Sequence, residues 1–258
     1  MTQRPEYLTS PLFADAGFSH AFFTRRGGVS QGPYSSLNFS VSVGDTEGAV
    51  SKNLELAARA LGVEPERVFC LSQVHGNQTV TLRGAERREE VLERRGDALV
   101  SGAPDLACAV RTADCVPILL ADRSKGAVAA VHAGWRGVVA GVVSAAVSAL
   151  DALARGNYDL IAAIGPHISQ AAFEVSEDVA EQLLAVAPGL PGVADRSAAK
   201  PHVSLRVLVR AELERAGLRP EAVDDVPGCT VGDAHFFYSY RRDGPRSGRH
   251  LSAIVPKR

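Results

Sequence analysis

The sequence predicts an α+β fold, a single-domain mixed α/β sandwich over residues 1–258 in which a mixed β-sheet core is flanked by helices. Three observations support this prediction. The chain has 258 residues, 46% of them hydrophobic, so it can bury a large core. Short apolar runs typical of strands are mixed with helical stretches, without the regular alternation of a doubly wound sheet. No repeat or low-complexity linker divides the chain.

Most of the predicted strands lie in the first half of the chain. An apolar segment, HAFFT (20–24), leads into a polar, Gly-rich loop (25–36). Asp45 or Thr46 is a suitable N-cap for a helix that stops at Gly62. Short apolar runs then follow that are bounded by Gly, Asp or Ser, and several of them are expected to be buried on both faces. They predict strands at 68–71, 79–82, 98–100, 106–110, 116–121 and 127–132.

Two further segments differ sharply in charge. Residues 85–97, AERREEVLERRGD, are densely charged, and we expect an exposed helix or a mobile excursion there. Residues 138–150 are uncharged and Ala-rich but shorter than the ~20 residues that span a bilayer. They predict a buried helix over 138–154 that ends at Gly156-Asn157. The remaining pattern predicts a strand at 159–165, helices near 176–187 and 205–216, and strands near 223–226, 235–240 and 250–255.

The charge balance and the N-terminal residues exclude several classes of protein. The net charge is −1, from 28 basic and 29 acidic residues, whereas a general nucleic-acid binder has a basic excess. The N-terminal residues contain neither the basic nor the apolar region of a signal peptide, which indicates a cytoplasmic protein without a membrane partner. The four cysteines, at positions 70, 108, 115 and 229, are then expected to be thiols rather than disulfides.

Three potential metal ligands each follow an apolar strand and precede a sharp turn. They are His75, Cys115 and His132, in the segments LSQVHGN, RTADCVPILL and AVHAGWRG. Two imidazoles and one thiolate form a zinc-binding set, and three protein ligands leave a fourth position open, as in catalytic zinc sites. Their separations of 40 and 17 residues match no short zinc motif. From the residues alone, hydrogen-bonded structural histidines therefore stay open as the alternative.

The combination of these segments resembles one family, the laccase-domain or polyphenol oxidase proteins of the YfiH type. TADC-x-P, followed seventeen residues later by HAGWRG and preceded by Q-x-HG, carries the resemblance. It continues at 24–45, 162–175 and 229–255 and so spans nearly the whole chain. In that family the residues matching His75, Cys115 and His132 bind a zinc ion. The resemblance therefore implies zinc at these positions.

The resemblance also implies an activity on purine nucleosides. Members phosphorolyse adenosine, inosine and methylthioadenosine, and they deaminate adenosine hydrolytically. Beside Cys115 and His132, Asp114 is the nearest carboxylate in sequence for acid–base chemistry. Arg25, Arg26 and Arg136 are candidates for holding phosphate, since a guanidinium binds phosphate through two hydrogen bonds. Asn38, in the same N-terminal segment as the first two arginines, is a further candidate for substrate contact.

The chain departs from the family pattern at two places that concern the substrate. Many members read V-x-x-NR where this chain has Asn53-Leu54, so a basic residue expected to contact substrate is absent. A Cys-Cys-Tyr-Glu-Val run is replaced by residues 172–175, AFEV, and His167 adds an imidazole upstream of it. These changes leave the proposed metal ligands intact but weaken the assignment of the substrate.

Other functions use the same residues differently. Cys115 and His132 could form a nucleophile–base pair of a hydrolase or amidase that edits peptidoglycan precursors, because the family's fold is similar to that of the cytotoxic necrotizing factor toxin domain. Copper could replace zinc and support phenol oxidation, but the paired H-x-H motifs of multicopper oxidases are absent. A non-catalytic, metal-dependent adaptor is a further class. GVSQG (28–32) matches a hydrolase nucleophile motif but precedes Pro33 instead of a helix. A small-molecule substrate and a monomer or homodimer are expected.

Overall fold

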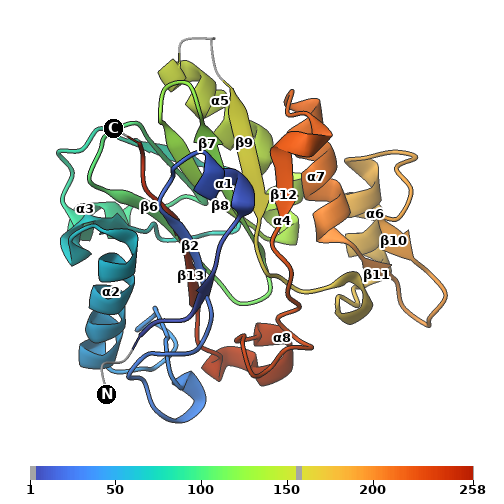
Figure 1. Ribbon diagram of the computed structural model, residues 1–258. Coiled ribbons are helices and arrows are strands. Elements are labelled where there is room, and N and C mark those ends of the chain that lie inside the picture. The colour runs from blue at the N-terminus through green and yellow to red at the C-terminus, as the bar shows by residue number, and fades with distance from the viewer. Residues whose placement is uncertain (1–3, 155–158, 258) are drawn as a thin grey trace.

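Two mixed β-sheets form the centre of the structure, with helices on both sides (Figure 1). The computed structural model describes residues 4–154 and 159–257. One sheet has the order β1-β2-β13-β6-β3, the other has the order β12-β9-β7-β8-β5-β4, and β10 and β11 form a separate pair. The strands are β1 (Tyr7–Leu8), β2 (His20–Phe23), β3 (Val68–Phe69), β4 (Thr79–Leu82), β5 (Ala98–Ser101), β6 (Ala107–Thr112), β7 (Val116–Asp122), β8 (Val128–Ala133), β9 (Leu160–Ile164), β10 (Ala194–Asp195), β11 (His202–Val203), β12 (Val223–Asp225) and β13 (His250–Ile254).

Both large sheets contain parallel and antiparallel pairs. In the five-stranded sheet, β3 runs parallel to β6 and the other pairs are antiparallel. In the six-stranded sheet, β4 is parallel to β5 and β12 to β9. The α-helices of the described residues are α1 (Pro11–Asp15), α2 (Glu47–Leu61), α3 (Arg88–Glu93), α4 (Trp135–Val139), α5 (Val142–Ala154), α6 (Glu177–Ala185), α7 (Leu205–Arg215) and α8 (Tyr240–Asp243).

The alternation of side chains along β7 shows how the layers are held together. Leu119 and Ala121 face the five-stranded sheet and pack in the same cluster as Phe22 of β2. Ile118 and Leu120 point the opposite way and pack with α5 and α7. Each fully buried aliphatic side chain contributes roughly 1.5–3 kcal/mol. A third cluster joins α2 to the outer face of the five-stranded sheet. The predicted sandwich with a mixed-sheet core is therefore confirmed.

The predicted elements agree with the structure over most of the chain. Thr46 caps α2, because its Oγ1 accepts a hydrogen bond from Ala49 N at 3.3 Å, and Gly62 ends the helix with a φ of 76°. The short strands at 79–82 and 223–226 also form, within a residue of their predicted bounds. No helix of the described residues is long and apolar enough to cross a membrane.

The buried helix predicted over 138–154 is instead two helices. The first, α4, begins earlier, at Trp135, and Gly141 then separates it from α5. Gly141 has a φ of 77°, which interrupts the right-handed helix and changes its direction. Gly156-Asn157, the predicted end of the helix, lies outside the described residues.

The charged segment 85–97 does not behave as one exposed unit. Its helix, α3, covers only six residues, and Val91 within it is fully buried. Asp97, which the charge pattern assigned to solvent, is also fully buried. The expectation was wrong for this residue because β5 begins immediately after it and carries it into the interior.

The strand predicted at 235–240 is absent, and turns and the short helix α8 take its place. Backbone N–H groups in this segment donate hydrogen bonds to side chains, where a strand would donate to a neighbouring strand. Tyr238 N donates to His250 Nε2 at 2.8 Å, and Ser239 Oγ accepts from Arg242 N at 3.2 Å. The aromatic pattern that indicated a strand reflects burial of Phe237 and Tyr238 from a loop.

Candidate metal centre and substrate cavity

A buried carboxylate organises the loop that carries His75. This loop lies between β3 and β4, and His75 has a φ of 60°, in the left-handed region. Asp97 Oδ1 accepts a hydrogen bond from His75 N at 2.9 Å, and its Oδ2 accepts from Gly76 N at 2.7 Å and Val74 N at 3.3 Å. Three consecutive backbone N–H groups therefore fix the turn on one side chain.

The same carboxylate orients His132 on β8. Ala98 of β5 pairs with Val131 of β8, so Asp97 and His132 are neighbours across the two strands. His132 Nδ1 hydrogen-bonds to Asp97 Oδ1 at 2.8 Å. Since a carboxylate only accepts, Nδ1 carries the proton and Nε2 is left to bind a metal or another group.

Cys115 lies in the turn between β6 and β7, where the chain crosses from the five-stranded to the six-stranded sheet. Asp114 precedes it with a φ of 92°. Asp114 Oδ1 accepts a hydrogen bond from Thr230 Oγ1, and its Oδ2 accepts from Arg241 N, each at 2.6 Å. The strained turn is thereby tied to the C-terminal loop region.

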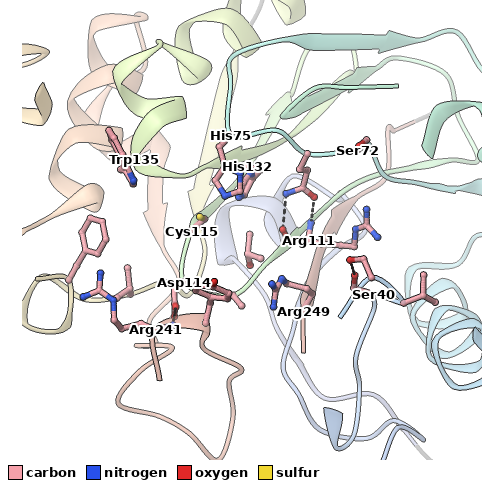
Figure 2. A pocket seen from close by; sticks show the side chains of 18 of the residues that line it. Ser40, Ser72, His75, Arg111, Asp114, Cys115, His132, Trp135, Arg241 and Arg249 are labelled. Atoms are coloured by element: carbon pink, nitrogen blue, oxygen red, sulfur yellow. Dashed lines mark hydrogen bonds between the residues drawn. The ribbon is translucent and has the colours of Figure 1, made fainter. Parts of the chain in front are cut away.

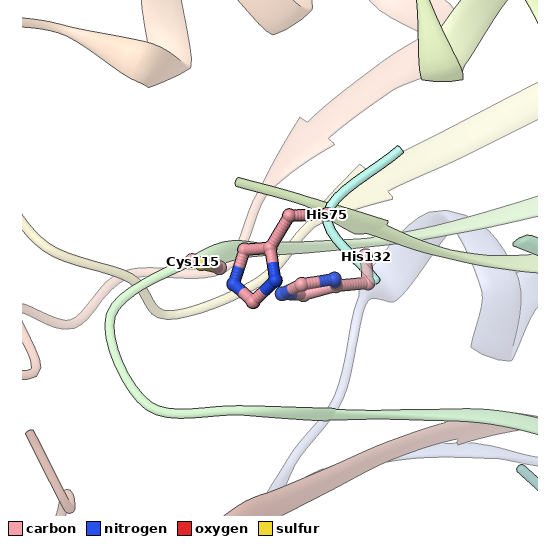
Figure 3. A group of neighbouring side chains, drawn as sticks. All are labelled: His75, Cys115 and His132. Carbon is pink, nitrogen blue, oxygen red and sulfur yellow. The ribbon is translucent and has the colours of Figure 1, made fainter. Parts of the chain in front are cut away.

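The three predicted ligands meet in space (Figure 3). The ligand atoms of His75, Cys115 and His132 all lie within 4.8 Å of one another. The two imidazole rings are 4.7 Å apart between centroids and are nearly perpendicular, at 80°. Residues far apart in the sequence are thus brought together from a loop, a turn and a strand.

Opposite charges stabilise one another within this group. Burial alone would raise the pKa of the Cys115 thiol, but the charge of His132 and hydrogen bonds from both imidazoles outweigh it and lower the pKa. Burial would likewise lower the pKa of His132, but the Cys115 thiolate and Asp97 outweigh it and raise the pKa. The site favours a thiolate, which is the form that binds metals.

The donor set fits a single metal ion. Two imidazoles and a thiolate are ligands that zinc accepts in open, four-coordinate sites, and copper accepts them as well. A carboxylate bonded to the far nitrogen of a ligating histidine, as Asp97 is to His132, is the usual outer support of such sites. Among the described residues, His75, Cys115 and His132 are the group of histidine, cysteine and acidic side chains close enough to hold an ion.

Gly134 provides the space in which the ligands meet. A Cβ at this position would lie 2.9 Å from His75 Cδ2 and 3.0 Å from Cys115 Sγ. Such short contacts would force both ligand side chains to shift if Gly134 carried a Cβ. The Gly of the HAGWRG motif is therefore required by the closeness of the ligands.

The three ligands open into a cavity of about 790 Å³ (Figure 2). This volume is within the range of small-molecule sites. One end is lined by Trp135 and Phe173, with Arg241 over the Phe173 ring, and the other by Arg111, Arg249 and Ser40. The lining residues are Ser40, Val41, Ser42, Ser72, Gln73, His75, Leu92, Arg111, Thr112, Ala113, Asp114, Cys115, His132, Trp135, Ile168, Phe173, Tyr240, Arg241 and Arg249.

Arg25 and Arg26, predicted to hold phosphate, are not among the residues that line this cavity. Arg25 Nε donates to Ser35 O at 2.9 Å, and its guanidinium lies over the Tyr238 ring. Arg26 forms an exposed ion pair with Glu6. In this structure both side chains tie the N-terminal loop to neighbouring segments.

The other predicted contacts are also not among the residues that line the cavity. Arg136 is exposed and stacks on Trp135 at 4.5 Å. Asn38 is fully buried, and its Oδ1 accepts a hydrogen bond from Arg249 N at 2.8 Å. His167, the additional imidazole, is bonded through Nδ1 to the Gly165 carbonyl and does not line the cavity. Of the predicted residues, only Asp114 and the three ligands line it.

Sequence reasoning missed three residues that the structure places at the site. Asp97 supports two ligands, and Arg111 and Arg249 line the basic end of the cavity. Arg111 precedes the TADC segment by one residue, and Arg249 lies in the GRH segment of the C-terminal resemblance. The position of these two arginines in or beside the motif segments is the sequence signal that could have identified them.

Comparison with known proteins shows the family to which the chain belongs. The family described as multi-copper polyphenol oxidoreductase laccase matches residues 19–257. The chain belongs to this laccase-domain family. A relative from Streptomyces coelicolor, named purine nucleoside phosphorylase, is 42% identical over 227 residues, which are 88% of this chain and 91% of the relative.

Solved structures of the laccase-domain type share the fold. YlmD from Geobacillus stearothermophilus matches with a TM-score of 0.91 and 28% identity, covering 100% of this chain and 98% of the other. YfiH from Bacillus licheniformis matches with a TM-score of 0.88 and 25% identity, covering 99% and 97%. The predicted resemblance to the YfiH type is therefore confirmed.

Proposed function

We propose that this protein is a zinc-dependent purine nucleoside enzyme. It phosphorolyses adenosine, inosine and methylthioadenosine, and it deaminates adenosine. The observation that carries the proposal is the His75, Cys115 and His132 group on the wall of a 790 Å³ cavity, in a chain related over most of its length to a purine nucleoside phosphorylase. Zinc is preferred to copper because no further histidine of the described residues joins the group.

Zinc would be held by the two imidazoles and the thiolate, and when bound it supplies a water of lowered pKa and a Lewis acid. Asp97 keeps the proton on His132 Nδ1, so that Nε2 faces the ligand group. Asp114 lines the cavity, and each of its oxygens accepts one hydrogen bond. A second lone pair on each oxygen can still accept a proton from substrate, so Asp114 is our candidate for acid–base chemistry.

Product analysis tests the proposal directly. Zinc-loaded protein is incubated with adenosine, with and without phosphate, and adenine is separated from inosine. We expect adenine and ribose 1-phosphate only with phosphate, and inosine in both mixtures. The Cys115→Ser variant should lose all three products, whereas the matched Cys229→Ser variant, altered outside the cavity lining, should keep them. Absence of all three products from the zinc-loaded protein would refute nucleoside chemistry.

A second function is favoured by one specific observation. Cys115, His132 and Asp97 form a series of thiol, imidazole and carboxylate, as in cysteine hydrolases. In a hydrolase or amidase of this kind, His75 has no chemical role. Metal analysis of His75→Ala therefore separates the two functions. Loss of about one zinc per chain together with activity supports the zinc enzyme, and a metal-free, active His75→Ala variant that is inactivated by alkylation of Cys115 supports the hydrolase.

A further inference from the structure

Two arginines from neighbouring strands meet at one end of the cavity. Arg111 is in β6, and Arg249 immediately precedes β13, which pairs with β6 through His250 opposite Thr112. Leu251 lies opposite Arg111 in this pairing, and Arg249 is two residues before Leu251. Side chains two apart in a strand share a face, so both guanidinium groups point to the same side of the sheet. Both line the cavity.

Neither arginine forms an ion pair with a carboxylate of the described residues. Within residues 4–154 and 159–257, no ion pair includes Arg111 or Arg249. Arg249 Nη1 donates to the carbonyls of Ser247 and Gly248, at 2.7 and 3.0 Å, and Arg111 Nη2 donates to Leu71 O at 3.1 Å. The remaining guanidinium N–H groups are left for a ligand. Burial lowers the pKa of Arg249 and outweighs the nearby negative charges of Cys115 and Asp114, which raise it. The positive charge of Arg111 lowers it slightly further.

Hydroxyl groups complete this end of the cavity. Ser40 lines it and its Oγ is 2.8 Å from Ser42 Oγ. Asn38 joins the serine loop to the arginine, because its Oδ1 accepts hydrogen bonds from Ser40 N at 3.2 Å and Arg249 N at 2.8 Å. Figure 2 shows Arg111, Arg249 and Ser40 on one side of Cys115, opposite Trp135. Two unpaired cations and hydroxyl donors are suited to an anion with several oxygens.

We propose that Arg111, Arg249 and Ser40 form the subsite for inorganic phosphate, which rests on the proposed phosphorolysis. A phosphate oxygen held there forms the bond to C1′ of the ribose. The bond from C1′ to the purine nitrogen breaks, its electron pair leaves with the purine, and the purine takes up a proton. The purine then occupies the opposite end of the cavity, beside Trp135 and Phe173. One face of each ring is already stacked by a guanidinium, that of Arg136 on Trp135 and that of Arg241 on Phe173.

Phosphate binding and kinetics together test the subsite. Binding of inorganic phosphate is measured by calorimetry at constant ionic strength in Arg111→Gln and Arg249→Gln. We expect the Kd for phosphate to rise about ten- to a hundredfold in each, as for the loss of charged hydrogen bonds. The KM for phosphate should rise similarly, while the KM for inosine changes less than twofold. Arg59→Gln, an equal charge change on the exposed end of α2, should leave both unchanged.

If a glutamine variant fails to fold, the same measurements are made on Arg111→Lys and Arg249→Lys. They keep the charge and lose the paired hydrogen bonds, so a smaller rise in Kd is expected. If phosphorolysis proceeds with an unchanged KM for phosphate in the folded variants, the subsite is wrong and the function stands. If wild-type protein binds phosphate through these arginines but splits no nucleoside, the subsite stands and the proposed function fails.

Discussion

Replacing Asp97 by asparagine removes the charge that connects the fold to the metal centre. In the wild type, four N–H groups converge on this side chain, those of Val74, His75, Gly76 and the His132 ring. Asparagine retains one acceptor oxygen. Its amide nitrogen must then face N–H donors, which can no longer hydrogen-bond there.

The magnitude follows from these contacts. If the asparagine oxygen still accepts hydrogen bonds from His75 N and His132 Nδ1, the hydrogen bonds from Gly76 N at 2.7 Å and Val74 N at 3.3 Å are lost. A hydrogen bond to a charged acceptor contributes about 1.5–3 kcal/mol, and the longer bond contributes less. The free energy of unfolding should fall by roughly 3 kcal/mol. Zinc affinity should fall ten- to a hundredfold, as is usual when the outer support of a ligand is removed.

Urea unfolding of the metal-free protein measures the first effect, and zinc competition against a coloured chelator measures the second. Asp15→Asn, on the exposed face of α1, is the matched control and should change neither. An Asp97→Asn protein with an unchanged unfolding midpoint and a zinc affinity within twofold of wild type would refute the role assigned to this carboxylate.

Three further predictions concern packing and pH. Gly134→Ala should abolish zinc binding, measured by metal analysis, while the melting temperature of the metal-free protein falls little, because the added methyl group meets Cys115 Sγ at 3.0 Å. Gly165→Ala should lower the unfolding free energy by at least 1–3 kcal/mol in urea, since its Cβ would lie 2.2 Å from Phe22 Cδ1. Burial of Glu212 raises its pKa from 4.5 to about 7, so the folded state holds this proton more tightly than the unfolded state. The free energy of unfolding should therefore fall by up to about 3 kcal/mol as the pH rises from 4.5 to above 7. Urea titrations at several pH values measure this dependence, and Glu212→Gln should remove it. An equal dependence on pH in the variant would contradict the assignment.

The sequence predicts those parts of the fold that depend on local pattern. Buried strands such as 116–121 are continuous apolar runs, and α2 has its cap and its stop within its own segment. The helix over 138–154 was predicted as one element because a glycine inside a helical pattern does not by itself indicate a break. Only the φ of Gly141, 77°, shows that the helix is interrupted there. The strand at 235–240 was predicted because a buried aromatic loop has the composition of a strand.

The site residues also fall into those that a local sequence pattern indicates and those that only the fold brings together. His75, Cys115 and His132 were predicted because they lie in distinctive sequence motifs. Asp97 was missed because its role depends on the pairing of β5 with β8, which no local pattern in a charged segment indicates. Arg249 reaches Arg111 only through the pairing of β13 with β6, between residues far apart in the chain.

The turn at Cys115 has a consequence for specificity. Arg111 is in the five-stranded sheet and Arg249 immediately precedes β13 of that sheet, whereas His132 is in the six-stranded sheet, on β8, which leads into α4. The span between the two ends of the cavity therefore depends on how closely the sheets pack, through side chains such as Leu119 that do not line the cavity. A change in the thickness of this layer would alter which ligand fits the cavity, with every residue of the cavity wall left as it is.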